Sequence, residues 1–191
     1  MKHLILFVCL LIASTSFAKI IRVNNQEPTN PQQSTYASLQ DAYDNAQAGD
    51  TLYIEGSTDD YGFIEVSKRV TFIGPGYFLT ENVGTQVNVQ PAVIRRIEFL
   101  SGSEGSKVIG LTIYYVNTGY ILLDADNIEI TKTHFLNNAS ISIARGTFDN
   151  ISIRQNYFLT QPIKWGQFTH LFQNLFFANN IVLGEFKLPD N

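Results

Sequence analysis

The chain has 191 residues, of which 45% are hydrophobic and 16% are charged, so it can bury the core of one domain or of two small ones. This composition excludes a disordered tail, a coiled coil and a collagen-like fibre. The formal net charge is -4 and basic residues form no run, which argues against a nucleic-acid partner. The 14 Phe, 9 Tyr and 13 Gly favour β structure.

The first 18 residues have the features of a secretory signal peptide. Lys2 precedes an apolar run over 4–13, and a small-x-small cleavage pattern ends at Ala18. A membrane anchor, the competing interpretation, needs about 20 apolar residues, and neither this run nor any later one is long enough. We therefore expect export to the periplasm, the cell surface or the medium, no membrane span, and a single mature domain over 19–191. The single cysteine, Cys9, would leave with the signal peptide, so no disulfide is expected.

A short helix is expected near the start of the mature chain. Over 36–47 the apolar residues follow helical spacing, with Ser38 as the N-cap and Asp41 three residues later. This helix would cover the apolar end of the structure that follows. A polar excursion over 82–90 separates the first strands from the later ones. The first strands are expected at 51–55, 63–66 and 70–73.

The clearest internal repeat covers 108–183. Four segments with similar alternation of apolar and polar residues begin at positions 108, 130, 153 and 177, which are 22, 23 and 24 residues apart. A unit of this size with two or three short strands cannot bury its apolar face alone and must stack on the next unit. The sequence therefore predicts a solenoid of short strands.

An asparagine precedes the repeated strand in each of the last three units, at Asn127, Asn150 and Asn174. The three side chains would lie above one another in a solenoid. Their amides could then hydrogen-bond from coil to coil, as in the ladders of stacked strands. We expect a structural role for them rather than a catalytic one.

Four segments carry a family resemblance: YASLQDA at 36–42, AGD at 48–50, VTFIGPGY at 70–77 and GSEGSKVIGLTI at 102–113. They are similar to the opening part of proteins of the pectin lyase-like superfamily, most of all to exported members from Bacteroidetes-type bacteria. The resemblance extends from Lys19 to about Gly184. It implies an all-β fold, a right-handed parallel β-helix with coils of about 22 residues and a short N-terminal capping helix. It does not imply an activity, because this fold is used by lyases, hydrolases and adhesins.

The hydrolases of this superfamily resemble one another in four short strings, Asn-Thr-Asp, Asp-Asp, Gly-His-Gly and Arg-Ile-Lys. This chain does not contain the four strings together. The lyases use a basic residue to abstract a proton, and Lys132 and Arg154, diagonal on neighbouring coils, are the candidates here. The alternative is that they form cross-coil salt bridges and solubilise a sheet face. The lyases also bind Ca²⁺ through oxygen ligands, which Asp124 and Asp126 could provide, although the pair could equally be a solvated turn.

Three tyrosines are candidates for ligand binding, because aromatic rings stack on sugars. They are Tyr114, Tyr115 and Tyr120, and the alternative is that they cap a turn or pack under a loop. His134 and His170 have no second histidine or carboxylate at ligand spacing, so no metal site is expected there.

These features favour an exported module without a recognisable catalytic motif, acting as a binding or structural protein with polysaccharide as the expected ligand. The alternative is a polysaccharide lyase or glycoside hydrolase that acts on acidic polysaccharide, with Ca²⁺ as the candidate cofactor.

The C-terminal end has no second capping helix in its sequence, although terminal repeats need a cap. Either the segment 184–191, through Phe186 and Leu188, folds back over the last coil, or that coil pairs with a second copy of the chain. The homodimer would bury four side chains, those of Leu171, Phe172, Leu175 and Phe176.

Overall fold

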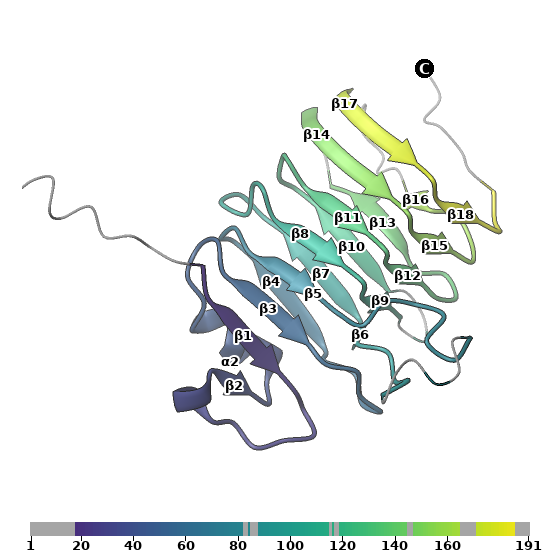
Figure 1. Cartoon of the computed structure of the whole chain (residues 1–191). Helices are drawn as coiled ribbons and strands as arrows, with labels where there is room; N and C mark the ends of the chain where they lie inside the picture. The colour runs from purple at the N-terminus through teal and green to yellow at the C-terminus, as the bar shows by residue number, and fades with distance from the viewer. Residues whose placement is uncertain are drawn as a thin grey trace, which may run out of the picture.

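The chain is a parallel β-solenoid of about five turns (Figure 1). The structure, a computed structural model, describes residues 18–81, 84, 88–114, 116, 119–144, 147–164 and 171–185. Residues 1–17 of the expected signal peptide, and residues 186–191 with Phe186 and Leu188, thus lie outside the described residues. Among the helices of the described part, none has both the length and the apolar character needed to cross a membrane.

The largest sheet has eight strands in the order β17-β14-β11-β8-β5-β3-β1-β2. Every strand pairs in parallel with its neighbours. From β1 to β17 successive coils add one strand each, so the colour in Figure 1 changes steadily over this part of the sheet, whereas β2 pairs with the other side of β1. The strands are β1 (Ile20–Val23), β2 (Thr35–Tyr36), β3 (Thr51–Ile54), β5 (Thr71–Ile73), β8 (Lys107–Ile109), β11 (Glu129–Thr131), β14 (Thr147–Arg154) and β17 (Leu171–Ala178).

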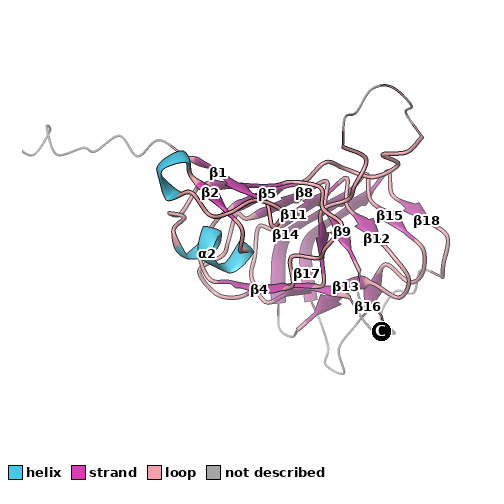
Figure 2. Cartoon of the chain, turned by 90° about the horizontal axis from the view of Figure 1, so that it is seen from below, coloured by secondary structure: helices cyan, strands magenta, loops and turns pink. Residues whose placement is uncertain are grey.

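Two five-stranded sheets complete the walls around the interior (Figure 2). One has the order β16-β13-β10-β7-β4, with β4 (Phe63–Val66), β7 (Arg96–Phe99), β10 (Tyr120–Leu123), β13 (Ser140–Ile143) and β16 (Ile163–Lys164). The other has the order β18-β15-β12-β9-β6, with β6 (Val93–Ile94), β9 (Thr112–Ile113), β12 (His134–Phe135), β15 (Tyr157–Phe158) and β18 (Ile181–Val182).

The coils stack in the register that the sequence repeat predicts. Val108 pairs with Ile130, Ile130 with Ile153, and Ile153 with Phe177, so the prediction of a parallel β-helix is confirmed. The first three of these side chains are fully buried, since strand residues alternate between the interior and the outer face. Phe72 of β5 pairs with Val108 across a longer interval, because the chain between them includes the excursion that precedes β6.

The N-terminal cap is shorter than predicted. The helix α2 covers Leu39–Asp44 rather than 36–47, because Tyr36 instead belongs to β2, which pairs with β1. The expected N-cap is confirmed, since the Ser38 hydroxyl accepts a hydrogen bond from the backbone N–H of Asp41 at 3.2 Å. Leu39, Ala42 and Tyr43 of the helix are buried against the solenoid.

The predicted asparagine ladder is present in part. Asn127, Asn150 and Asn174 all have positive φ angles, of 57°, 55° and 62°, a conformation that asparagine tolerates better than most residues. The amide of Asn150 donates to the side-chain oxygen of Asn127 at 3.1 Å, but that of Asn174 donates to Asp149 at 3.0 Å. All three are exposed, so their side chains support the corners of the coils and not the core.

A second asparagine ladder lies inside the solenoid. Asn156 is fully buried; its side-chain oxygen accepts from the N–H of Thr133, and its amide donates to the carbonyl of Ile130, both at 2.9 Å. Asn180 repeats this pattern one coil later, accepting from the N–H of Asn156 and donating to the carbonyl of Ile153 at 2.9 Å. These bonds satisfy backbone groups between β11 and β12 and between β14 and β15, where the backbone leaves one sheet for the next.

The C-terminal coil is less buried than the coils before it. Leu175, Phe177 and Val182 pack against the core but are only partly buried, and Phe176 and Leu183 are 54% and 64% exposed. The strands β17, β16 and β18 each stand at the edge of their sheet.

Candidate functional site

One corner of the solenoid carries a column of polar residues in a left-handed backbone conformation. Lys132, Gln155 and Asn179 follow β11, β14 and β17, and their φ angles are 51°, 56° and 54°. Gly110, after β8, has the same place on the preceding coil and a φ of 69°. The left-handed conformation turns the chain sharply from the eight-stranded sheet into the next one, and it is costly for Lys and Gln, which have a Cβ.

The segment 74–81 runs beside this column, although it follows β5 in sequence. The N–H of Gly76 donates to the carbonyl of Gly110 at 2.7 Å, which joins the segment to the corner. A Cβ on Gly74 would lie 2.6 Å from the same carbonyl oxygen, so this close approach needs glycine. Further along, the hydroxyl of Tyr77 donates to the carbonyl of Gln155 at 3.0 Å. The segment thus crosses several coils.

An aromatic cluster holds this segment on the outer face of β12 and β15. Tyr77 and Phe78 contact His134 and Tyr157, with ring centroids 5.0 to 6.4 Å apart. The rings of Tyr77 and Phe78 lie 4.8 Å from each other, and those of His134 and Tyr157 lie 4.7 Å apart. Burial lowers the pKa of His134, and its Nε2 has no hydrogen-bond partner among the described residues. His134 pairs with Thr112 and Tyr157, as expected for an outward strand residue.

A depression of about 510 Å³ lies between the column and the segment, and it is called the groove below. It is lined by Gly76, Tyr77, Lys132, Gln155 and Asn179. The groove therefore combines an aromatic side chain, two amides and one ammonium group. The side chain of Lys132 is exposed and makes no hydrogen bond or ion pair with any residue that the structure describes. Such a mixture of donors, acceptors and a ring is suited to a polar ligand that carries negative charge.

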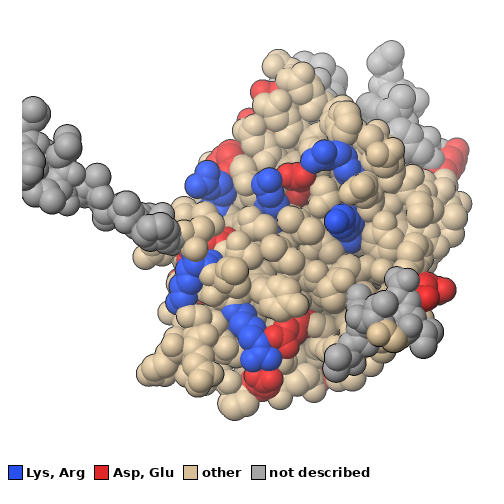
Figure 3. All heavy atoms as spheres, in the orientation of Figure 1, with Lys and Arg blue, Asp and Glu red and all other residues tan. Residues whose placement is uncertain are grey.

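Arg154, the second candidate base, lies next to the groove but has acidic and aromatic neighbours. It pairs with Thr131 of β11, which places it diagonal to Lys132 as predicted, and its guanidinium forms an ion pair with Glu129. Lys107 also pairs with Glu129, at 2.9 Å, and the hydrogen bond from Lys107 lowers the pKa of that carboxyl group, with Arg154 adding to the effect. Figure 3 shows basic and acidic groups side by side on this face of the molecule. Of the two roles predicted for Arg154, a base that abstracts a proton or a member of a cross-coil salt bridge, the structure therefore shows the salt bridge.

Asp124 and Asp126 lie in the corner after β10. Asp124 is exposed, and Asp126 accepts a hydrogen bond from the N–H of Asp149 on the next coil at 2.9 Å. Within the described ranges, no group of three or more His, Cys, Asp or Glu side chains is placed to hold a metal ion. The two carboxylates would thus need further oxygen ligands to bind Ca²⁺.

Of the candidate tyrosines that the structure describes, neither Tyr114 nor Tyr120 lines the groove. Tyr115 lies outside the described residues, and Tyr114 follows β9 and is partly exposed. Tyr120 is on the outer face of β10, where its hydroxyl donates to Glu98 at 3.0 Å and accepts from Arg96 at 3.2 Å. Burial raises the pKa of Tyr120, and the hydrogen bond to Glu98 raises it further.

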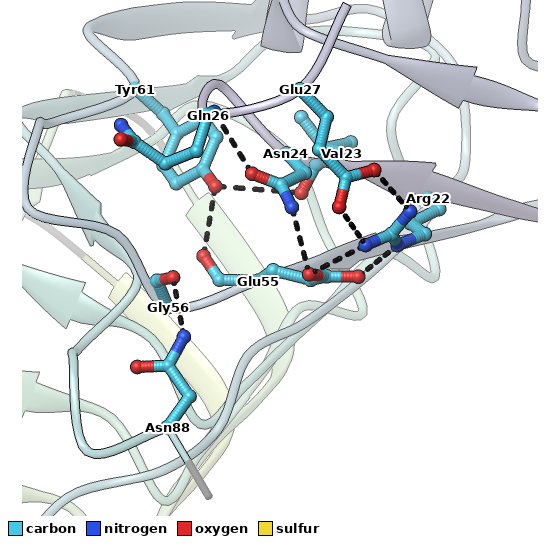
Figure 4. Close-up of polar contacts among 9 residues, drawn as sticks. All are labelled: Arg22, Val23, Asn24, Gln26, Glu27, Glu55, Gly56, Tyr61 and Asn88. Atoms are coloured by element: carbon cyan, nitrogen blue, oxygen red, sulfur yellow. Dashed lines mark hydrogen bonds and ion pairs between the residues drawn. The ribbon is translucent and has the colours of Figure 1, made fainter. Parts of the chain in front are cut away.

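A dense polar network lies on the first coil (Figure 4). Arg22 forms ion pairs with both Glu27 and Glu55, and Asn24 donates to Glu55 at 3.0 Å. The hydrogen bond from Arg22 lowers the pKa of Glu27. Tyr61 donates to the carbonyl of Glu55 at 2.9 Å, and burial raises its pKa to about 12. Because these charges are paired with one another, the network stabilises the first coil.

Comparisons with models of protein families, with curated proteins and with solved structures found no match to this chain. The groove is where the described residues combine a depression, an aromatic side chain and an unpaired cation. The sequence indicated Lys132 but missed its neighbours. Gln155 and Asn179 do occupy equivalent places in the aligned repeats, one residue before Asn156 and Asn180, and this regularity was a usable signal. Tyr77 gave no such signal, since it lies in a segment that does not repeat.

Proposed function

We propose that the chain is an exported member of the pectin lyase-like superfamily that binds acidic polysaccharide in the groove and does not cleave it. The observation that carries this proposal is the column of Lys132, Gln155 and Asn179 opposite Tyr77. Successive coils are about 4.8 Å apart, so the three side chains extend over about 10 Å. A polymer with regularly placed carboxylate and hydroxyl groups could contact them one after another.

The chemistry of the groove supports an acidic sugar rather than a neutral one. The ammonium group of Lys132 can pair with a carboxylate, and the amides of Gln155 and Asn179 can donate to and accept from hydroxyl groups. The ring of Tyr77 is held in place by its hydrogen bond to Gln155 and by the aromatic cluster, so little conformational entropy is lost when a sugar packs against it.

Binding is favoured over cleavage because the second basic side chain near the groove, that of Arg154, is already paired with Glu129. A lyase requires a base together with a group that neutralises the carboxylate beside the abstracted proton. The guanidinium of Arg154 is paired with Glu129, which leaves Lys132 to serve as the counterion of the sugar. A lyase that uses Lys132 or Arg154, with Ca²⁺ at Asp124 and Asp126, is the second candidate. An assay for the ultraviolet absorbance of unsaturated uronates, with and without Ca²⁺, distinguishes the two: sustained turnover contradicts the binding proposal.

The proposal is tested by titration calorimetry of the chain without residues 1–18 against oligogalacturonate, alginate oligosaccharides and a neutral oligosaccharide. The variant Lys132→Ala should bind acidic oligosaccharides at least about tenfold more weakly, because a hydrogen bond to a charged group is worth about 1.5–3 kcal/mol. Lys164→Ala is the matched control, since Lys164 lies on β16 and donates to the carbonyl of Asn138. Equal loss in both variants, or no binding to any acidic glycan, contradicts the proposed function.

We also propose that the C-terminal coil pairs with a second copy of the chain. Support comes from the partly exposed apolar side chains of this coil, with Phe176 at 54% and Leu183 at 64% exposure, and from the three edge strands. An isologous contact would cover these edges in both copies.

A further inference from the structure

A second depression lies beside the N-terminal cap and shares no residue with the groove. Its volume is about 350 Å³, and parts of the chain that are distant in sequence form its walls. They are Asn25 after β1, residues 37–40 at the start of α2, residues 60–63 before and at the start of β4, and Arg95 between β6 and β7. The depression is therefore formed only when the cap and the first coils have assembled.

The wall formed by residues 60–63 is held in place by several bonds. One carboxylate oxygen of Asp60 accepts from the N–H of Gly62 at 2.8 Å and pairs with the guanidinium of Arg95 at 2.9 Å. The N–H of Arg95 in turn donates to the carbonyl of Gly62 at 2.7 Å. Tyr61, between them, is buried and hydrogen-bonded to Glu55. A ligand that binds here would meet a wall that is already ordered, so binding would cost little conformational entropy.

Phe63 places an exposed aromatic ring at the edge of this depression. It is 57% exposed, yet its backbone is fixed as the first residue of β4, paired with Arg96 of β7. The guanidinium of Arg96 lies 4.9 Å from the centroid of the ring, which holds the ring by a cation–π contact. A large exposed apolar ring that is held in one orientation beside a depression is the arrangement that packs against the C–H face of a sugar.

The charges around the depression determine which sugar fits. Arg95 and Asp60 neutralise each other, and the other polar side chains of the lining, those of Asn25, Ser38, Gln40 and Tyr61, are uncharged. These groups offer both donors and acceptors but no net charge, in contrast to Lys132 in the groove. A neutral hydroxylated ring matches them, whereas a carboxylate would have no unpaired cation to meet.

We propose that this depression is a second carbohydrate site, which binds a neutral sugar residue against Phe63. The inference does not rest on the groove, since none of its residues contributes to both sites. A chain with both sites would hold two chemically different parts of a glycan mixture, an acidic polymer at one corner of the solenoid and a neutral one at the cap.

The test is saturation-transfer NMR followed by calorimetry with neutral hexasaccharides, namely cellohexaose, xylohexaose, mannohexaose and a galactan hexasaccharide. At least one should bind, and Phe63→Ala should weaken its binding about five- to tenfold. Tyr53→Ala is the matched control, because Tyr53 is also an exposed aromatic strand residue, 42% exposed on β3, but does not border the depression. Lys132→Ala should leave the binding of neutral hexasaccharides unchanged.

Two results would overturn this inference. One is that no neutral hexasaccharide in the panel binds the unmodified chain. The other is that Phe63→Ala and Tyr53→Ala bind alike. Oligogalacturonate binding, measured on the same samples with Lys132→Ala, reports on the groove separately, so failure of either site is recognised on its own.

Discussion

Replacement of Asn156 by alanine should destabilise the solenoid far more than any change at its exposed asparagines. The side chain of Asn156 is fully buried, and it is the partner of the N–H of Thr133 and of the carbonyl of Ile130. Alanine would leave both backbone groups without that partner in the buried interior of the solenoid. A buried polar group without a partner costs about 1–3 kcal/mol, so the free energy of unfolding should fall by about 4 kcal/mol.

The measurement is equilibrium unfolding in urea, followed by circular dichroism and tyrosine fluorescence. Asn150→Gly is the matched control, because Asn150 is exposed, has a φ of 55° that glycine adopts freely, and also donates to a neighbouring coil. Loss of the hydrogen bond from Asn150 should lower the free energy of unfolding by less than about 1 kcal/mol, as expected for an exposed hydrogen bond. If Asn156→Ala costs no more than Asn150→Gly, the inner ladder does not hold the coils together as described.

Four further predictions concern stability, glycan binding and assembly. Burial lowers the pKa of His134, so the folded state disfavours its proton and the free energy of unfolding should decrease as the pH falls from 6.5 to 5; His134→Phe should remove this part of the pH dependence in urea titrations. Glu129→Gln removes two partly exposed ion pairs and should cost at most about 1 kcal/mol, and less at high salt, in thermal melts at two ionic strengths. Gly74→Ala would place a Cβ 2.6 Å from the carbonyl oxygen of Gly110, so the segment that carries Tyr77 would have to move away from the corner. Because Tyr77 forms one wall of the groove, calorimetry should detect weaker binding of acidic glycan. Light scattering should find a dimer that Phe176→Asp converts to a monomer, and a monomeric unmodified chain contradicts the proposed pairing.

The sequence predicted the stacked coils because their period is visible in the apolar residues. Each of Val108, Ile130 and Ile153 is buried at the same place in its coil, and burial of equivalent positions constrains residue type strongly. The exposed corner was found because Asn127 and Asn150 recur at the same place in successive units, where a positive φ favours asparagine. The inner ladder was missed because Asn156 is surrounded by outward-facing polar residues in the sequence, and nothing local indicates that its side chain points inward.

The groove could be predicted only in part. Lys132 stood out as a charge at a repeated position, but the wall opposite it comes from Tyr77, which is 55 residues earlier in the chain. Its path depends on the close contact between Gly74 and Gly110, a property of the folded backbone. A cross-coil salt bridge of Arg154 was among the predicted alternatives, because strand register follows from the period, but the prediction did not name Glu129 as its partner.

The most direct test of the account is a crystal structure of the chain with a bound trigalacturonate. The account predicts the oligosaccharide in the groove, with a carboxylate within hydrogen-bond distance of the Lys132 ammonium group, a sugar ring against Tyr77, and hydroxyl groups on the amides of Gln155 and Asn179. An oligosaccharide bound on another face, with the groove unchanged, would contradict it.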